Sequence, residues 1–163
     1  MTLPNLVTFL RILLIPLFIL FLLIPNLPLA AGLFIILALS DAVDGFLARF
    51  LKQTSDLGKF LDPLADKILV LSGLIGLIEL KIIPALPVII IMIRELAVMG
   101  LRTSAAAGGT VIAASYSAKW KTISQLTAVP WLILNLPYGI WILWLAVILT
   151  VISGVEYFWN QLK

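Results

Sequence analysis

Long apolar runs separated by short polar breaks divide the chain into six segments. A helix that crosses a bilayer needs about 20 mostly apolar residues, and each segment approaches that length. The expected helices cover residues 6–24, 28–50, 60–79, 84–104, 119–136 and 138–158. The pattern therefore predicts an all-α, polytopic membrane protein with six transmembrane helices. No internal repeat and no second domain is visible, so we expect a single transmembrane domain over residues 1–163.

Two polar stretches interrupt this pattern on the same expected side of the membrane. A linker from Lys52 to Lys59 separates the second and third segments, and Pro63 then falls in the expected first turn of the third helix. A proline is tolerated there because that turn needs no amide donor from it. The other stretch, residues 105–118, is expected to be a loop that contains Tyr116 and Ser117.

The composition excludes several classes of protein. The chain is 63% hydrophobic with a mean hydropathy of +1.19, which is far more apolar than a water-soluble domain of 163 residues requires. Only 12% of its residues are charged, so a net charge of +3 does not indicate nucleic-acid binding. The absence of His and Cys disfavours zinc sites, disulfides and cysteine chemistry. The first apolar run lacks a basic leader and a small-residue cleavage site, so we expect it to remain as a helix.

The distribution of Lys and Arg predicts the orientation of the helices. If the N-terminus is inside, the inner side receives Lys52, Lys59, Lys119, Lys121 and Lys163. The expected outer loops contain only Lys81. Because cytoplasmic loops carry the excess of basic residues, we expect a bacterial inner (cytoplasmic) membrane protein whose N-terminus and polar cavity face the cytoplasm.

Four carboxylates stand out in this apolar background. Asp41 and Asp44 are three residues apart and Asp62 and Asp66 are four apart, so each pair shares one face of a helix. Small residues accompany them, which leaves room for a ligand to approach the backbone; these are Gly45, Ala48 and Gly58. Two such helices packed together would direct all four carboxylates to one point.

Four neighbouring anions near a membrane core need positive charge close by. An all-oxygen cluster suits Mg²⁺ or Mn²⁺, and two such ions would balance four carboxylates. Two-metal sites are typical of enzymes that displace groups at phosphorus. The plainer interpretation, that these acids are helix caps or solvated residues, fits Asp62 before Pro63. It does not explain why all four recur in helical phase beside small residues.

Arg94 and Glu95 lie near the middle of the expected fourth helix, where charge is costly. In one interpretation they pair with each other or with neighbouring helices and hold the bundle together. In the other, Arg94 faces a wet cavity and binds a phosphate. Arg102, Lys119 and Lys121 would then complete a basic pocket for an anionic substrate.

The central stretch has the form D-x2-D-G-x2-A-R-x8-G-x3-D-x3-D. It closely resembles the signature of the CDP-alcohol phosphatidyltransferase family at every fixed position. The matching residues are Asp41, Asp44, Gly45, Ala48, Arg49, Gly58, Asp62 and Asp66. The resemblance extends along the chain, because that family has six transmembrane helices.

The resemblance implies transfer of a phosphatidyl group from CDP-diacylglycerol to sn-glycerol 3-phosphate, with CMP as the leaving group, by a homodimer embedded in membrane lipid. It implies that Asp41, Asp44 and Asp62 hold the metals, with Asp66 partly shared, and that Asp66 is the general base. The resemblance also implies that Asp41 and Asp44 belong to the CDP-diacylglycerol-binding residues. The remaining motif residues would make space for the cytidine or hold the nucleotide; these are Gly45, Ala48, Gly58 and Arg49.

Other functions stay open at this point. The acceptor in the same chemistry could be inositol phosphate, serine or phosphatidylglycerol, although the basic residues favour a phosphorylated acceptor over serine. A divalent-cation transporter would use acids spread through the membrane depth and often shows an internal repeat. Here the acids cluster towards one end and no repeat is visible, which disfavours transport.

Overall fold

The computed structural model describes residues 3–24, 26–51, 56–109 and 116–161. Within these ranges the side chains of residues 3–7, 41–51, 56–63, 107 and 160–161 are not part of the description. The described residues form helices and turns, with no strand among them, which confirms the all-α prediction. The helices are α1 (Leu3–Leu23), α2 (Leu27–Leu51), α3 (Asp56–Glu79), α4 (Ala85–Ala107), α5 (Tyr116–Ile133) and α6 (Gly139–Gln161).

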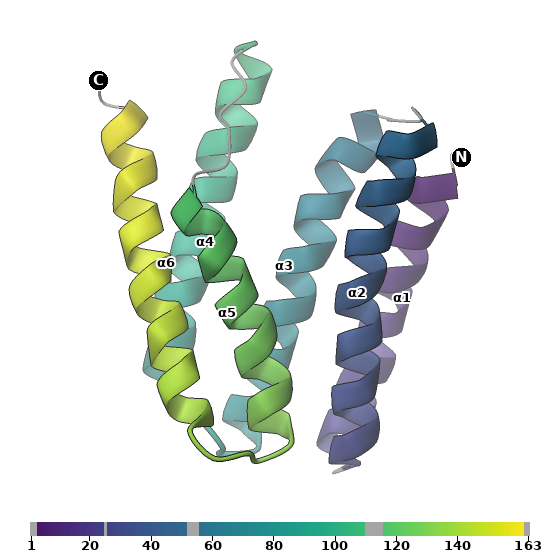
Figure 1. The fold of residues 1–163 in the computed structure, drawn as a ribbon, viewed down its shortest axis with the longest axis vertical. Coiled ribbons are helices and arrows are strands. Elements are labelled where there is room, and N and C mark those ends of the chain that lie inside the picture. The colour runs from purple at the N-terminus through teal and green to yellow at the C-terminus, as the bar shows by residue number, and fades with distance from the viewer. Residues whose placement is uncertain (1–2, 25, 52–55, 110–115, 162–163) are drawn as a thin grey trace.

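Successive helices run in opposite directions, so both termini lie at the same end of the bundle (Figure 1). Helix α1 packs against α2 and α3, while α6 packs against α4 and α5. Helices α2 and α3 both also contact α5, which joins the two halves. Tight turns close the opposite end, where Lys81, Asn135 and Tyr138 adopt positive φ angles.

The apolar core follows the contacts between these helices. Phe18 of α1 and Phe34 of α2 are fully buried, with ring centroids 5.6 Å apart. Two glycines let α3 approach its neighbours closely: a Cβ on Gly73 would lie 2.8 Å from Val129 Cγ1 of α5, and one on Gly76 would lie 2.5 Å from Leu22 Cδ2 of α1. Close helix packing through small residues is common where helices associate in lipid.

Large apolar side chains also cover the outside of the bundle. Leu13, Ile36, Ile93 and Val155, which come from four different helices, are each about 60% exposed. Soluble monomers rarely expose apolar surface on this scale. Among the described residues, Gly139–Trp159 is long and apolar enough to cross a membrane, and Thr8–Leu23 and Leu27–Ser40 form shorter apolar helical segments.

The helix limits correct some of the expected boundaries. Helix α3 begins at Asp56, inside the expected polar linker, so Pro63 lies in the helix interior and not in its first turn. Helix α5 begins at Tyr116, so Tyr116 and Ser117 are helical and not part of a loop. Helix α4 also extends to Ala107, beyond its expected end. The starts of α3 and α5 therefore include polar residues, and the added turn of α4 consists of alanines.

Candidate active site

The two aspartate pairs lie on neighbouring helices at one end of the bundle. Asp41 and Asp44 belong to the second half of α2, and Asp62 and Asp66 belong to the first half of α3. Because α2 and α3 are antiparallel and in contact, both pairs lie towards the end that carries the two termini (Figure 1). This placement of the backbone agrees with the expectation that the four aspartates come from two adjacent helices.

Most of the signature side chains lie outside the described residues. This applies to the predicted ligands of the metals and the nucleotide, namely Asp41, Asp44, Gly45, Ala48, Arg49, Gly58 and Asp62. Among the side chains that are described, no three acidic groups converge as a metal site would require. The metal and nucleotide roles of these residues therefore stay predictions.

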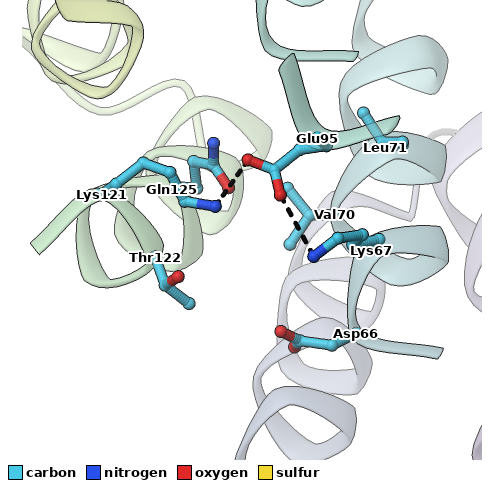
Figure 2. A pocket seen from close by; sticks show the side chains of 8 residues that line it. All are labelled: Asp66, Lys67, Val70, Leu71, Glu95, Lys121, Thr122 and Gln125. Atoms are coloured by element: carbon cyan, nitrogen blue, oxygen red, sulfur yellow. Dashed lines mark hydrogen bonds and ion pairs between the residues drawn. The ribbon is translucent and has the colours of Figure 1, made fainter. Parts of the chain in front are cut away.

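Asp66 is the signature aspartate whose surroundings are described. It lies four residues after Asp62, one turn deeper in α3 on the same face. Its partly buried carboxylate points into the space between α3 and α5 (Figure 2). The pocket there has a volume of about 320 Å³, including the space at its mouth, and is lined by Asp66, Lys67, Val70, Leu71, Glu95, Lys121, Thr122 and Gln125.

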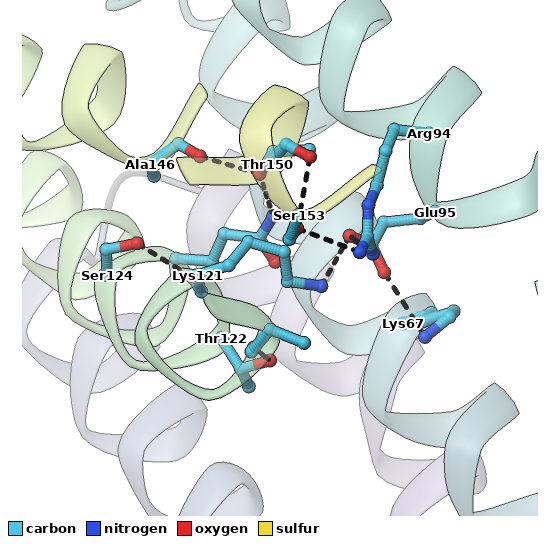
Figure 3. A network of polar contacts seen from close by, with 11 residues as sticks. Lys67, Arg94, Glu95, Lys121, Thr122, Ser124, Ala146, Thr150 and Ser153 are labelled. Atoms are coloured by element: carbon cyan, nitrogen blue, oxygen red, sulfur yellow. Dashed lines mark hydrogen bonds and ion pairs between the residues drawn. The ribbon is translucent and has the colours of Figure 1, made fainter. Parts of the chain in front are cut away.

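One buried carboxylate organises the charges of this pocket. The Glu95 side chain is only 4% exposed, and its Oε1 lies 2.5 Å from Lys121 Nζ. Its Oε2 lies 3.2 Å from Lys67 Nζ, and Oε1 also lies 3.2 Å from Arg94 Nη1. Figure 3 shows how these side chains come from three helices to the same carboxylate. Glu95 thus links α3, α4 and α5 beside Asp66.

Arg94 continues this network into α6. Its Nη2 donates a 2.9 Å hydrogen bond to Ser153 Oγ, and its guanidinium lies 5.6 Å from the centre of the Tyr157 ring. Gly154 leaves room for the side chain, because a Cβ there would lie 3.0 Å from Arg94 Cγ. The interpretation that Arg94 and Glu95 pair with each other and with neighbouring helices is confirmed.

The four basic residues of the predicted acceptor pocket occupy different surroundings. Lys121 is buried and lines the pocket with Asp66, and Arg94 contacts the same Glu95 without lining the pocket. Arg102 and Lys119 are exposed, and Lys119 Nζ lies 5.4 Å from the centre of the Tyr116 ring. The structure thus brings Lys121 to Asp66 and Arg94 to Glu95, while Arg102 and Lys119 face outwards.

Sequence reasoning missed Lys67 as a member of this site. Lys67 directly follows Asp66 in the sequence. Its helical position supplies a signal: residues 66, 67, 70 and 71 all line the pocket, which is the i, i+1, i+4, i+5 pattern of one helix face. Gln125 was also missed. Its position four residues after Lys121, on the same face of α5, supplies the corresponding signal.

A second buried polar contact joins α1 to α2. The Arg11 side chain is only 1% exposed, and its Nε donates a 3.2 Å hydrogen bond to Ser40 Oγ. Ser40 Oγ in turn donates to the carbonyl of Leu37 at 2.8 Å. Since Ser40 directly precedes Asp41, this contact fixes α1 beside the start of the aspartate signature.

Comparison with known proteins decides the family. Residues 1–152 match the sequence model of the family described as CDP-alcohol phosphatidyltransferase. The chain belongs to the CDP-alcohol phosphatidyltransferase family. The resemblance carried by the aspartate signature is thereby confirmed.

Several relatives within this CDP-alcohol phosphatidyltransferase family share one name, CDP-diacylglycerol–glycerol-3-phosphate 3-phosphatidyltransferase. The protein of that name from Bacillus subtilis is 43% identical, over 99% of this chain and 97% of its own length. The one from Rickettsia bellii is 39% identical, over 96% of this chain and 93% of its own length. The one from Pseudomonas fluorescens is 36% identical, over 100% of this chain and 88% of its own length.

Proposed function

We propose that the protein transfers the phosphatidyl group of CDP-diacylglycerol to sn-glycerol 3-phosphate, giving phosphatidylglycerophosphate and CMP. Family membership supports the reaction class, and the name shared by the near full-length relatives supports this donor and acceptor. The observation that carries the proposal is the pocket where Asp66 meets Lys67 and Lys121. It combines a carboxylate able to accept a proton with cations able to bind a phosphate.

Asp66 is the proposed general base. A base must lie within hydrogen-bond reach of the hydroxyl that it deprotonates, and Asp66 points into the pocket that would hold the acceptor (Figure 2). The hydroxyl oxygen of the acceptor forms a bond to the phosphorus that carries diacylglycerol, and the bond from that phosphorus to CMP breaks. The hydroxyl proton passes to Asp66 and CMP leaves with the bonding electron pair.

Lys67 and Lys121 are the proposed contacts of the acceptor phosphate. Both line the pocket, and an ammonium group has three donors, so contact with Glu95 leaves donors for a second anion. Arg102 and Lys119, which are exposed, would attract the anionic acceptor towards the pocket through their longer-range field. Arg94 would act indirectly, because its guanidinium is held between Glu95 and Ser153.

Two divalent cations, Mg²⁺ or Mn²⁺, are the proposed cofactors. The donor set suits them, since it consists of carboxylates on adjacent helices in a chain without His or Cys. Asp41, Asp44 and Asp62 would hold the ions, with Asp66 partly shared. When bound, such ions polarise phosphate oxygens and neutralise the charge that develops on the leaving group.

The nucleotide is proposed to bind over the α2 part of the signature. Asp41 and Asp44 would contact the donor through the metals, and Arg49 would hold the nucleotide side. Gly45, Ala48 and Gly58 would leave room for the cytidine, because small side chains let a ligand approach the backbone. We also propose that the chain acts as one domain over residues 1–163 and as a homodimer.

We propose that all six helices of the fold cross a bacterial inner membrane. The apolar exterior, the span Gly139–Trp159 and the family support membrane embedding. The bias of Lys and Arg supports a cytoplasmic location of both termini and of the aspartate end. A lipid-borne donor and a water-soluble acceptor would then meet at the cytoplasmic surface.

Metal-dependent release of CMP tests the reaction class. Purified protein in detergent micelles would receive CDP-diacylglycerol and sn-glycerol 3-phosphate, with Mg²⁺ or Mn²⁺ or with excess chelator. We expect CMP release with either ion, none in chelator, and recovery when the ion is restored. Full activity in excess chelator would contradict the two-metal proposal.

A further inference from the structure

Three helices each contribute one cation to a single carboxylate. Lys67 of α3, Arg94 of α4 and Lys121 of α5 all lie within 3.2 Å of an oxygen of Glu95. The side chains of Glu95, Lys121 and Arg94 are 4%, 6% and 10% exposed, whereas that of Lys67 is 22% exposed. The cluster is therefore almost closed on the α4–α6 side and open towards the pocket beside Lys67.

The charges in this cluster do not balance. The Glu95 carboxylate contacts three cations, and Asp66 is the other described acidic residue that lines the pocket, so cations outnumber carboxylates here by three to two. A buried cation is costly unless it is paired. Lys67 and Lys121 lie close together because both contact the Glu95 carboxylate, and their like charges would repel each other without it. The excess of positive charge favours a further anion in the pocket, and a phosphate monoester carries a charge of about −1.5 to −2 at pH 7.

Glu95 is itself held in place from the opposite side. Arg94 contacts its Oε1 and donates to Ser153 Oγ, which in turn donates to the carbonyl of Thr150. Because Thr150 Oγ1 accepts a 3.1 Å hydrogen bond from Gln125 Nε2, α5 is joined to the same support. The carboxylate therefore has little freedom to follow a moving lysine.

We propose that Glu95 is a positioning residue for acceptor recognition. It holds Lys67 and Lys121 at a fixed separation beside Asp66, so that their remaining donors face one phosphate monoester. Glu95 contacts no reacting atom in this scheme and acts through the two lysines. The inference rests on the proposed function, because it assigns part of the acceptor site of that reaction.

The test is the substitution Glu95→Gln, which keeps the side-chain shape and removes the charge. The KM for glycerol 3-phosphate should rise about tenfold or more, because the two lysines lose the charged group that holds them beside Asp66. The KM for CDP-diacylglycerol should change by less than about twofold, because the donor does not use the lysines. Glu79→Gln is the matched control, since Glu79 is an exposed carboxylate at the far end of α3.

A double-mutant cycle separates positioning from an independent effect. If Glu95 acts through Lys121, the Glu95→Gln change should add far less to the acceptor KM in a Lys121→Met background than in the native chain. Full additivity would contradict the proposal. Should the Gln variant fail to fold, Glu95→Asp replaces it, because it keeps the charge and withdraws the carboxylate by one methylene. The same selective rise in acceptor KM is expected.

The possible outcomes distinguish this inference from the proposed function. If the native protein releases no CMP with glycerol 3-phosphate, the proposed function fails and the inference fails with it. If the native protein is active and the Glu95 variants keep a normal acceptor KM, the inference alone is wrong. An equal rise in the KM of both substrates would show a general structural role and would also overturn it.

Discussion

Glu95 Oε1 lies 2.5 Å from Lys121 Nζ, although 26 positions separate the two residues in the sequence. Both side chains are buried, so this ion pair joins α4 to α5 inside the bundle. It also brings Lys121 to the pocket that Asp66 lines. One contact therefore links the stability of the bundle to the proposed acceptor site.

Lys121→Met should weaken the bundle and acceptor recognition together. The substitution removes the ammonium but keeps the length of the side chain, and Glu95 stays paired with Lys67 and Arg94. We expect a loss of about 1–3 kcal/mol in the free energy of unfolding, with a higher KM for glycerol 3-phosphate. Thermal unfolding in detergent and steady-state kinetics would measure the two effects.

Lys119→Met provides the stability control for that variant. Lys119 is exposed two positions before Lys121 on α5, so its loss should change the free energy of unfolding by less than about 0.5 kcal/mol. Equal destabilisation by the two substitutions would show that the buried contact of Lys121 with Glu95 does not contribute to the free energy of unfolding.

Asp66→Asn should abolish turnover while leaving the donor bound. An amide of the same shape cannot accept the hydroxyl proton, so kcat should fall by about 100-fold or more. Binding of CDP-diacylglycerol, measured by calorimetry with Mg²⁺ present, should persist. Glu79→Gln, also on α3, should keep normal turnover, because Glu79 is exposed at the far end of the helix. Near-normal kcat in Asp66→Asn would remove Asp66 from the role of base.

Gly73→Ala should destabilise the packing of α3 against α5. The new Cβ would lie 2.8 Å from Val129 Cγ1, and a β-branched side chain has little rotamer freedom with which to move away. Overpacking of this kind costs about 1–3 kcal/mol. Gly32→Ala is the control, because a Cβ there meets nothing within 4 Å and alanine favours a helix. A thermal midpoint that is unchanged in Gly73→Ala would contradict the close approach of α3 and α5.

The absence of native Cys permits a clean test of the membrane topology. Leu136→Cys would place one thiol in the exposed turn between α5 and α6, and Ser104→Cys would place one near the exposed end of α4. In intact cells whose outer membrane is permeable to it, an impermeant maleimide should label the first variant at once. It should label the second only after the inner membrane is opened. The reverse result would invert the proposed orientation.

The order and type of the helices could be predicted because both depend on local sequence. Each apolar segment became a helix in the described residues, and the breaks occurred near prolines and polar residues. The starts of α3 and α5 could not be predicted from hydrophobicity. The first turns of α3 and α5, which begin at Asp56 and Tyr116, have no continuous apolar face. The backbone hydrogen bonds of a helix form without such a face, so hydrophobicity does not mark these helix starts.

The candidate site could be predicted only in part. The spacing of the aspartates identified the family, and the adjacency of Arg94 and Glu95 suggested their pairing. The contacts of Glu95 with Lys67 and Lys121 depend on how α3, α4 and α5 pack, and periodicity within one helix carries no information about its partners. For the same reason, the sequence could not separate buried Lys121 from exposed Lys119, two positions away.

An acceptor panel tests the central claim most directly. Purified protein would receive labelled CDP-diacylglycerol and Mg²⁺ with one acceptor at a time: sn-glycerol 3-phosphate, inositol phosphate, serine or phosphatidylglycerol. CMP release and the mass of the lipid product would be followed together. We predict rapid CMP release and formation of phosphatidylglycerophosphate with glycerol 3-phosphate alone. Turnover with another acceptor, and none with glycerol 3-phosphate, would contradict the proposed function.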